Sequence, residues 1–264
     1  MTRLAHLFVS AIAALLAPSL IVASATAEER KTYTPLAVTV GKPLKAPPDL
    51  VAAAEAIRAA AAAGDRDAVY AGIADDLIFV DTGITVTVPR KAAKRSFDTA
   101  EAALEAIGLA FTGGEPVGPS GERLDMKDVR TATALARIAE DLMTPRWASD
   151  PMVPSGLCTR PGARWDAAAA VKAKFDHPAV FVLEPTEARA TVSADAKSVA
   201  RLVPGKLYLQ ADAGSGGKSR VTLPDGKGGW VAPGRALPAQ TWGFCFLPNV
   251  EGGWLLAAVV SARN

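Results

Sequence analysis

The chain has 264 residues, with 29 lysines and arginines against 27 aspartates and glutamates, a formal net charge of +2. Such a balance gives no electrostatic footprint for nucleic acid or for an anionic lipid surface, so neither is expected as a partner. Half of the residues are hydrophobic, and the length suits one large domain or two small ones.

Residues 1–27 have the pattern of an export signal. Arg3 supplies the positive charge, residues 7–22 are apolar, and residues 25–27 (Ala-Thr-Ala) form a small-residue cleavage site. The alternative is a membrane anchor, but Pro18 and Ser19 interrupt the apolar run and leave it shorter than the ~20 residues that a spanning helix needs. We therefore expect a periplasmic or secreted protein with a cleaved signal peptide and no stable membrane span afterwards.

The mature chain is predicted to open with a linker and two helices. Residues 28–47 are rich in proline, threonine and lysine, which indicates an exposed linker or a single early strand. Apolar side chains then recur at helical spacing over residues 50–63, between a capping Asp49 and a terminating Gly64. A second, shorter helix is predicted over residues 67–74.

The stretch LIFVDTGITVTV (77–88) has the β-branched content and the central Asp-Thr-Gly turn of a hairpin. Helices followed by this strand resemble, over about 40 residues, the opening of the α+β cone of ketosteroid-isomerase-like proteins. That family continues mostly as a curved sheet, whereas helices are predicted here over 99–110 and 128–142. That family has a conical pocket with an aspartate as base, and we assign no such base to this chain. Asp75, Asp76 and Asp81 are where it would lie, although acidic residues at turns are ordinarily solvated caps.

Two cysteines, Cys158 and Cys245, lie in segments that are predicted to be extended. In an oxidising compartment they are expected to form one disulfide bond. The alternative is a reactive thiol, which no CxxC spacing and no neighbouring histidine supports. Between and after the helices predicted over 99–110 and 128–142, the segments 111–125 and 143–158 are dense in glycine, proline and serine and are predicted to be loops. A last short helix is predicted over 166–175.

Beyond residue 178 the pattern changes to short extended runs separated by glycine-containing turns. The runs AVFVL, VARLVPGKLYLQ, SRVTL and GGWVA predict a small barrel, because a sheet this short must close to bury its apolar face. In the second run, alternation places Val199, Arg201 and Val203 on one face, with Ala200 and Leu202 on the other.

Residues 180–237 resemble the bacterial SH3-like domain of exported proteins. Glu187-Ala188-Arg189 corresponds to the first strand, 193–197 to the small-residue loop, 199–205 to the V-x-x-L-x-x-G segment, and 221–231 to the closing hairpin. The chain departs from the family at Thr191-Val192, where Gly-Pro is frequent, and at Lys218, where an aromatic residue commonly lines a peptide groove.

The resemblance implies a groove near residues 193–197 and Lys218 that recognises a peptide of peptidoglycan or of another envelope protein. Arg189, Tyr208 and Lys218 are our candidate ligand-binding residues. Trp230 is expected in the core, because the apolar face of a closing strand must be buried.

The last segment predicts a hairpin with a strand to about residue 247, a turn at 248–253 and a strand over 254–260. The final strand is apolar at nearly every position, so it must be covered on both faces and is expected to dock on the first region. We therefore predict an α+β fold in which residues 48–178 and 240–262 form one unit and an SH3-like barrel, 179–238, is inserted. The alternative is a tandem arrangement.

No motif points to catalysis, to a metal or to a cofactor. His177 is the one histidine after the signal, no HExxH or zinc-spaced cluster occurs, and residues 214–217 (Gly-Ser-Gly-Gly) lack the context of a phosphate loop. The prediction is a non-enzymatic binding protein of the cell envelope. Two alternatives stay open. An apolar cavity with inward carboxylates would favour a small-ligand or weakly hydrolytic α+β unit with the barrel as support. A large exposed apolar patch would favour a structural partner in an envelope complex.

Overall fold

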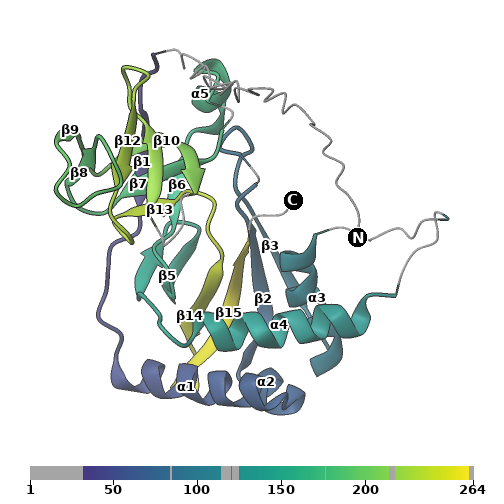
Figure 1. Cartoon of the computed structure of the whole chain (residues 1–264). Coiled ribbons are helices and arrows are strands. Elements are labelled where there is room, and N and C mark those ends of the chain that lie inside the picture. Colours follow the sequence, from purple (N-terminus) through teal and green to yellow (C-terminus); the bar gives the residue numbers. More distant parts are fainter. Residues whose placement is uncertain are drawn as a thin grey trace, which may run out of the picture.

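The computed structural model describes residues 32–83, 85–113, 120, 125–175, 177–213 and 218–261. The predicted signal peptide, 1–27, lies outside these residues. Within them the chain forms two sheets and five helices, which confirms the α+β class (Figure 1). No helix in this part of the chain combines the length and the hydropathy needed to cross a membrane.

The six-stranded sheet brings the last strand of the chain, β15, beside β2. Its order is β3-β2-β15-β14-β5-β4, and the last strand, β15, runs parallel to β2 and antiparallel to β14. Residues 256–260 of β15 are all buried, as expected for a strand with apolar side chains on both faces. The strands are β2 (Ile73–Asp81), β3 (Lys91–Ser96), β4 (Ala148–Asp150), β5 (Val153–Cys158), β14 (Gly243–Pro248) and β15 (Trp254–Ser261).

Four helices pack on one face of this sheet (Figure 1). In α1 the buried residues Leu50, Ala54, Ile57 and Ala61 recur at helical spacing, and Gly64 ends the helix in the left-handed region (φ 74°). This face meets apolar side chains of β2, β14 and β15 in one buried cluster. The helices are α1 (Pro48–Ala63), α2 (Arg66–Ala71), α3 (Ala100–Thr112), α4 (Lys127–Asp141) and, elsewhere, α5 (Ala167–Lys172).

The predicted second arm of the 77–88 hairpin is wrong. Residues 85–88 form a turn, and the strand that pairs with β2 is β3, Lys91–Ser96. Every residue of β3 is exposed. Charged side chains are typical of an edge strand, where they oppose pairing with another chain. The apolar Val86 of the turn is buried instead against the cluster beneath the second sheet.

The nine-stranded sheet contains the strands predicted beyond residue 178, together with β1 and β6. Its main path is β13-β7-β10-β11-β12-β8-β9, and β1 pairs with both β10 and β6. This path is open in the described residues, so closure into a barrel is not confirmed. The strands are β1 (Leu36–Val40), β6 (Ala163–Trp165), β7 (Ala179–Val182), β8 (Thr186–Arg189), β9 (Ser198–Leu202), β10 (Lys206–Ala213), β11 (Ser219–Thr222), β12 (Gly228–Val231) and β13 (Ala236–Pro238).

The predicted β11–β12 hairpin is confirmed. Its turn has Gly226 in the left-handed region (φ 84°), with the Gly226 N–H donating to the carbonyl of Leu223 and the Leu223 N–H to that of Lys227. Glycine adopts this conformation without a steric penalty. Alternation in β9 is confirmed as well. Leu202 is buried, whereas Val199 is 43% and Val203 42% exposed.

Cys158 on β5 and Cys245 on β14 are register partners and form the predicted disulfide, with their Cα atoms 3.9 Å apart. No free cysteine is present among the described residues, so the reactive-thiol alternative is wrong. The bond joins the two points at which the chain leaves the six-stranded sheet and returns to it. Strands β6 to β13 all lie between these points.

A polar cluster lies beside the disulfide. The guanidinium groups of Arg137 and Arg160 both contact the Trp242 ring, with their Cζ atoms 4.9 and 4.6 Å from its centroid. The buried Asp141 accepts hydrogen bonds from the Thr159 hydroxyl and from Arg160 Nε (2.9 Å). Burial raises the pKa of the Asp141 carboxyl, against the opposing effects of the Thr159 hydrogen bond and the Arg160 charge.

Replacing both cysteines by alanine should lower the free energy of unfolding by about 4–5 kcal/mol, because the disulfide closes a loop of 87 residues in the unfolded chain. Urea unfolding of the oxidised protein and of the C158A/C245A variant measures the difference. A reducing agent should leave the variant's midpoint unchanged. Equal midpoints for the two proteins would contradict the prediction.

Asp141→Asn should change the pH dependence of stability. The folded state holds the Asp141 proton more tightly than the unfolded state, so this group's contribution to stability falls as pH rises from its ordinary pKa of 3.8 through the raised value. The asparagine variant lacks that decline. Urea unfolding at several pH values between about 3 and about 7 tests it. Parallel profiles for the two proteins would show that Asp141 titrates normally.

Candidate functional site

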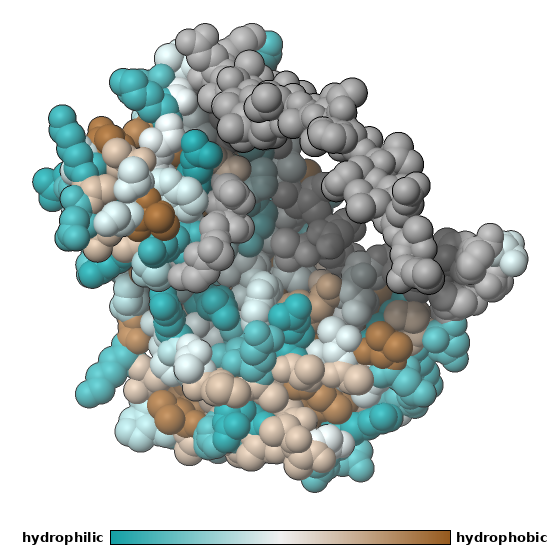
Figure 2. Space-filling model, in the orientation of Figure 1, coloured by the Kyte–Doolittle hydropathy of each residue, from teal (hydrophilic) through white to brown (hydrophobic). Residues whose placement is uncertain are grey.

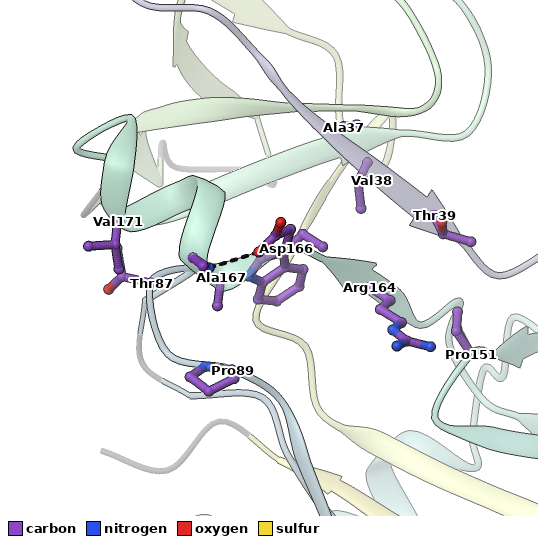
Figure 3. Close-up of a pocket in the computed structure, with 12 residues that line it drawn as sticks. Ala37, Val38, Thr39, Thr87, Pro89, Pro151, Arg164, Asp166, Ala167 and Val171 are labelled. Carbon is purple, nitrogen blue, oxygen red and sulfur yellow. Dashed lines mark hydrogen bonds between the residues drawn. The ribbon is translucent and has the colours of Figure 1, made fainter.

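A cleft of about 960 Å³ lies between β1, β6, α5 and the loop before β3 (Figure 3). Its walls are mainly apolar, with Val38, Pro89 and Val171 among the lining residues. Two charged side chains, Arg164 and Asp166, also line it. In volume the cleft lies within the usual range for ligand pockets.

Two polar side chains of this cleft, Asp166 and Trp165, have structural roles. The Asp166 carboxylate accepts the N–H groups of Ala168 (2.9 Å) and Ala169 (3.1 Å) and so caps α5. The indole N–H of Trp165 donates to the carbonyl of Val86 (2.6 Å), which fixes the ring. Across all described residues, no group of three His, Cys, Asp or Glu side chains could hold a metal ion. Asp166 and Trp165 therefore stabilise the fold around the cleft.

A second hollow, of about 230 Å³, lies on the nine-stranded sheet. We call it the β8–β12 groove. Figure 2 shows hydrophobic side chains among hydrophilic ones on the left of the view, where β8 and β9 lie in Figure 1. In the loop after β8, Val192 is 49% exposed. The lining residues come from the end of β8, the loop after it, the residue before β11 and the end of β12: Arg189, Thr191, Val192, Ser193, Ala194, Lys218, Trp230, Val231, Ala232 and Pro233.

Strand register places an aromatic ring between two arginines on the exposed face of this sheet. Trp230 on β12 is the direct partner of Arg189 on β8 and of Arg220 on β11. Residues directly opposite one another on antiparallel strands project from the same face. The alternate residues, Ala188 and Val231, are buried in the cluster on the other face. Trp230 is therefore only partly buried.

Two cations of the groove are held in place by the loop after β8. Arg189 Nη1 donates to the carbonyl of Ala196 (2.9 Å), and Lys218 Nζ donates to that of Val192 (3.3 Å). Among the described residues, no aspartate or glutamate lines the groove. The groove therefore combines two anchored positive charges with an aromatic surface.

Of the predicted binding residues, Arg189 and Lys218 line the groove, together with the start of the predicted 193–197 loop. Their role in binding stays a prediction. The expectation that Tyr208 offers an exposed contact is wrong. Its side chain is only 3% exposed, and its hydroxyl accepts the N–H of Val203 (2.9 Å). The reason is that β10 lies inside the sheet, so Tyr208 faces one apolar cluster while Leu207 faces another.

The expectation that Trp230 belongs to the core is also wrong. The apolar side of β12 is supplied by Val231, and at Gly229 a side chain would come within 2.9 Å of the Ala188 Cβ. Trp230 points the other way and lines the groove. The signal that could have placed it is the alternation in G-W-V, since the tryptophan and the valine must lie on opposite faces.

The acidic residues where a base would lie are not gathered in a cavity. Asp75 and Asp76 are exposed, and Asp76 accepts the Ser96 hydroxyl (2.7 Å). Asp81 accepts the Gly83 N–H (2.9 Å) at the turn after β2. His177 is exposed just before β7. None of these residues lines either hollow.

Comparison of the chain with models of protein families, with curated proteins and with solved structures found no match. The resemblances of residues 180–237 to SH3-like domains and of the first helices and strand to the ketosteroid-isomerase-like cone therefore stay predictions.

Replacing Tyr208 by alanine should lower the free energy of unfolding by about 3–5 kcal/mol, as for other buried aromatic residues. Replacing Lys218 by alanine should change it by about 0.5 kcal/mol or less, because the side chain is partly exposed and makes one long hydrogen bond. Urea unfolding of both variants checks the contrast. A Tyr208→Ala variant as stable as the wild type would restore the residue as a surface contact.

Proposed function

We propose that this is an exported, non-enzymatic binding protein of the periplasm or the cell exterior. An SH3-like module in its nine-stranded sheet recognises a peptide of the cell wall or of an envelope protein. The observation that carries the proposal is Trp230, a large aromatic residue that is only partly buried, in a groove with Arg189 and Lys218. Tryptophan and arginine are the residues most enriched at the energetic centres of protein interfaces.

The arrangement of strands supports the SH3-like part of the proposal. The segments matched by the resemblance occur as β8, β9, β10 and the β11–β12 hairpin, and β12 pairs with β8. The groove lies where the resemblance implied a peptide site, between the loop after β8 and Lys218. The groove is larger than the site that the resemblance implied, because residues at the end of β12 also line it.

The alternative of a ligand pocket in the helical unit has less support. It needs an apolar cavity with inward carboxylates, whereas Asp75 and Asp76 are exposed. The space between the helices and the six-stranded sheet is occupied by one cluster of buried side chains that includes Leu77, Phe244 and Phe246. We therefore assign recognition to the β8–β12 groove.

Co-sedimentation of the purified, disulfide-intact protein with isolated peptidoglycan sacculi tests the proposal. Point variants suit it better than deletion of residues 180–237, because that deletion would remove β7 and β10 from beneath β1 and α5. Trp230→Ala removes the aromatic surface of the groove. Val171→Ala is the control, since Val171 is 60% exposed and lines the other cleft.

The wild type and Val171→Ala should pellet with the sacculi. Trp230→Ala should be retained about 30-fold less tightly, the loss that corresponds to about 2 kcal/mol at an interface hot spot. Retention of Trp230→Ala at the wild-type level would show that the groove does not bind the wall. If no form pellets, the wall is not the partner, and the proposal then requires an envelope protein whose binding Trp230→Ala abolishes.

A further inference from the structure

The unused hydrogen-bond donors of the β8–β12 groove limit the chemistry of its ligand. A guanidinium has five N–H donors and an ammonium has three. Within the described residues, Arg189 is seen to use one donor, for the Ala196 carbonyl, and Lys218 one, for the Val192 carbonyl. The two carbonyls hold the cations in place without neutralising them. The groove therefore presents fixed donors that match a carboxylate.

Three acidic side chains of neighbouring segments, Glu187, Asp195 and Asp225, form no ion pair with Arg189 or Lys218 in the part of the chain that the structure describes. Glu187 precedes Arg189 by two residues on β8 and shares its face, but its carboxylate accepts the hydroxyl of Ser198 on β9, on the side of β8 away from β12. Asp225 forms an ion pair with Lys227 in the β11–β12 turn (2.9 Å). The exposed Asp195 lies in the loop after β8 and does not line the groove. Arg189 and Lys218 thus place two positive charges in the groove beside Trp230. Arg220 is not counted with them, because on β11 it is the register partner of Asp212 on β10.

The apolar part of the groove limits the size and shape of the ligand. Its volume of about 230 Å³ equals the share of about eight water molecules in the liquid, which suits one or two residues of a peptide. Trp230, Val192 and Pro233 supply apolar surface beside the cations. A net charge of only +2 makes a nucleic-acid backbone a poor match for the protein as a whole.

We propose that the groove takes an acidic peptide. A carboxylate of the peptide lies between Arg189 and Lys218, and the adjoining residue packs on Trp230. This inference rests on the proposed function and narrows its ligand to peptides that carry a carboxylate. Charge complementarity selects the ligand, and Trp230 supplies contact area that is independent of charge.

The test uses two end-blocked pentapeptides, Ala-Glu-Ala-Glu-Ala and its glutamine analogue, titrated calorimetrically into the exported protein. The acidic peptide should bind about tenfold more tightly or better, as expected for charge-assisted hydrogen bonds. The preference should shrink as ionic strength rises from about 0.05 to about 0.5 M. Lys218→Glu should abolish the preference, whereas Lys172→Glu, the same charge change at an exposed site on α5, should keep it.

Arg189→Gln is a second variant and should also abolish the preference, provided that its thermal unfolding matches the wild type. Equal binding of the two peptides, or a preference that survives Lys218→Glu, would overturn the inference. Tighter binding of a single-stranded oligonucleotide than of the acidic peptide would overturn it too. If sacculi retain the protein through Trp230 but neither peptide binds, this inference fails and the proposed function stands. If Trp230→Ala changes no binding at all, both fail.

Discussion

The burial of β15 is the constraint on which the rest of the structure depends. A strand that is apolar on both faces must lie inside a sheet, and β15 does so between β2 and β14 with a helical layer on one side. The chain must therefore return to its first region after building the nine-stranded sheet. The disulfide between β5 and β14 and the Asp141 cluster both lie at that point of return. The disulfide and the hydrogen bonds of Asp141 thus stabilise the position of β15, which is set by the burial of its apolar side chains.

This arrangement leaves one end of the nine-stranded sheet available for binding. β1, β6 and α5 cover the face that carries Phe181 and Leu207. Apolar side chains of β8, β11 and β12 bury the other face of β7 and β10. Strands β8 and β12 have one buried face, and the opposite face carries Arg189 and Trp230. In Figure 1, β8 and β9 lie at the end of the molecule remote from α1 and α2. A partner could thus reach the groove without disturbing the core.

Local sequence patterns predicted most elements, because helical spacing, alternation and turn residues are local properties. They predicted α1, the β11–β12 hairpin and the terminal hairpin, whereas the disulfide was predicted from the expected oxidising compartment. These patterns failed where the burial or pairing of a segment depends on the strands beside it. Tyr208 is buried because β10 is an interior strand, the strand that pairs with β2 is β3 and not residues 85–88, and β1 and β6 join the second sheet at β10. Of the groove, Arg189 and Lys218 were predicted from the resemblance. Trp230 was misplaced, because burial of the strand was given more weight than its alternation.

We propose that the ligand contacts Trp230 in the β8–β12 groove. The protein contains five tryptophans, and each indole N–H gives a separate signal in a ¹H–¹⁵N spectrum, assignable by single substitution. We would titrate the labelled protein with soluble peptide fragments of peptidoglycan and follow these five signals. The account predicts that the Trp230 signal shifts in a saturable way, while those of Trp147, Trp165, Trp242 and Trp254 stay in place. A shift confined to Trp165, beside the larger cleft, would contradict it.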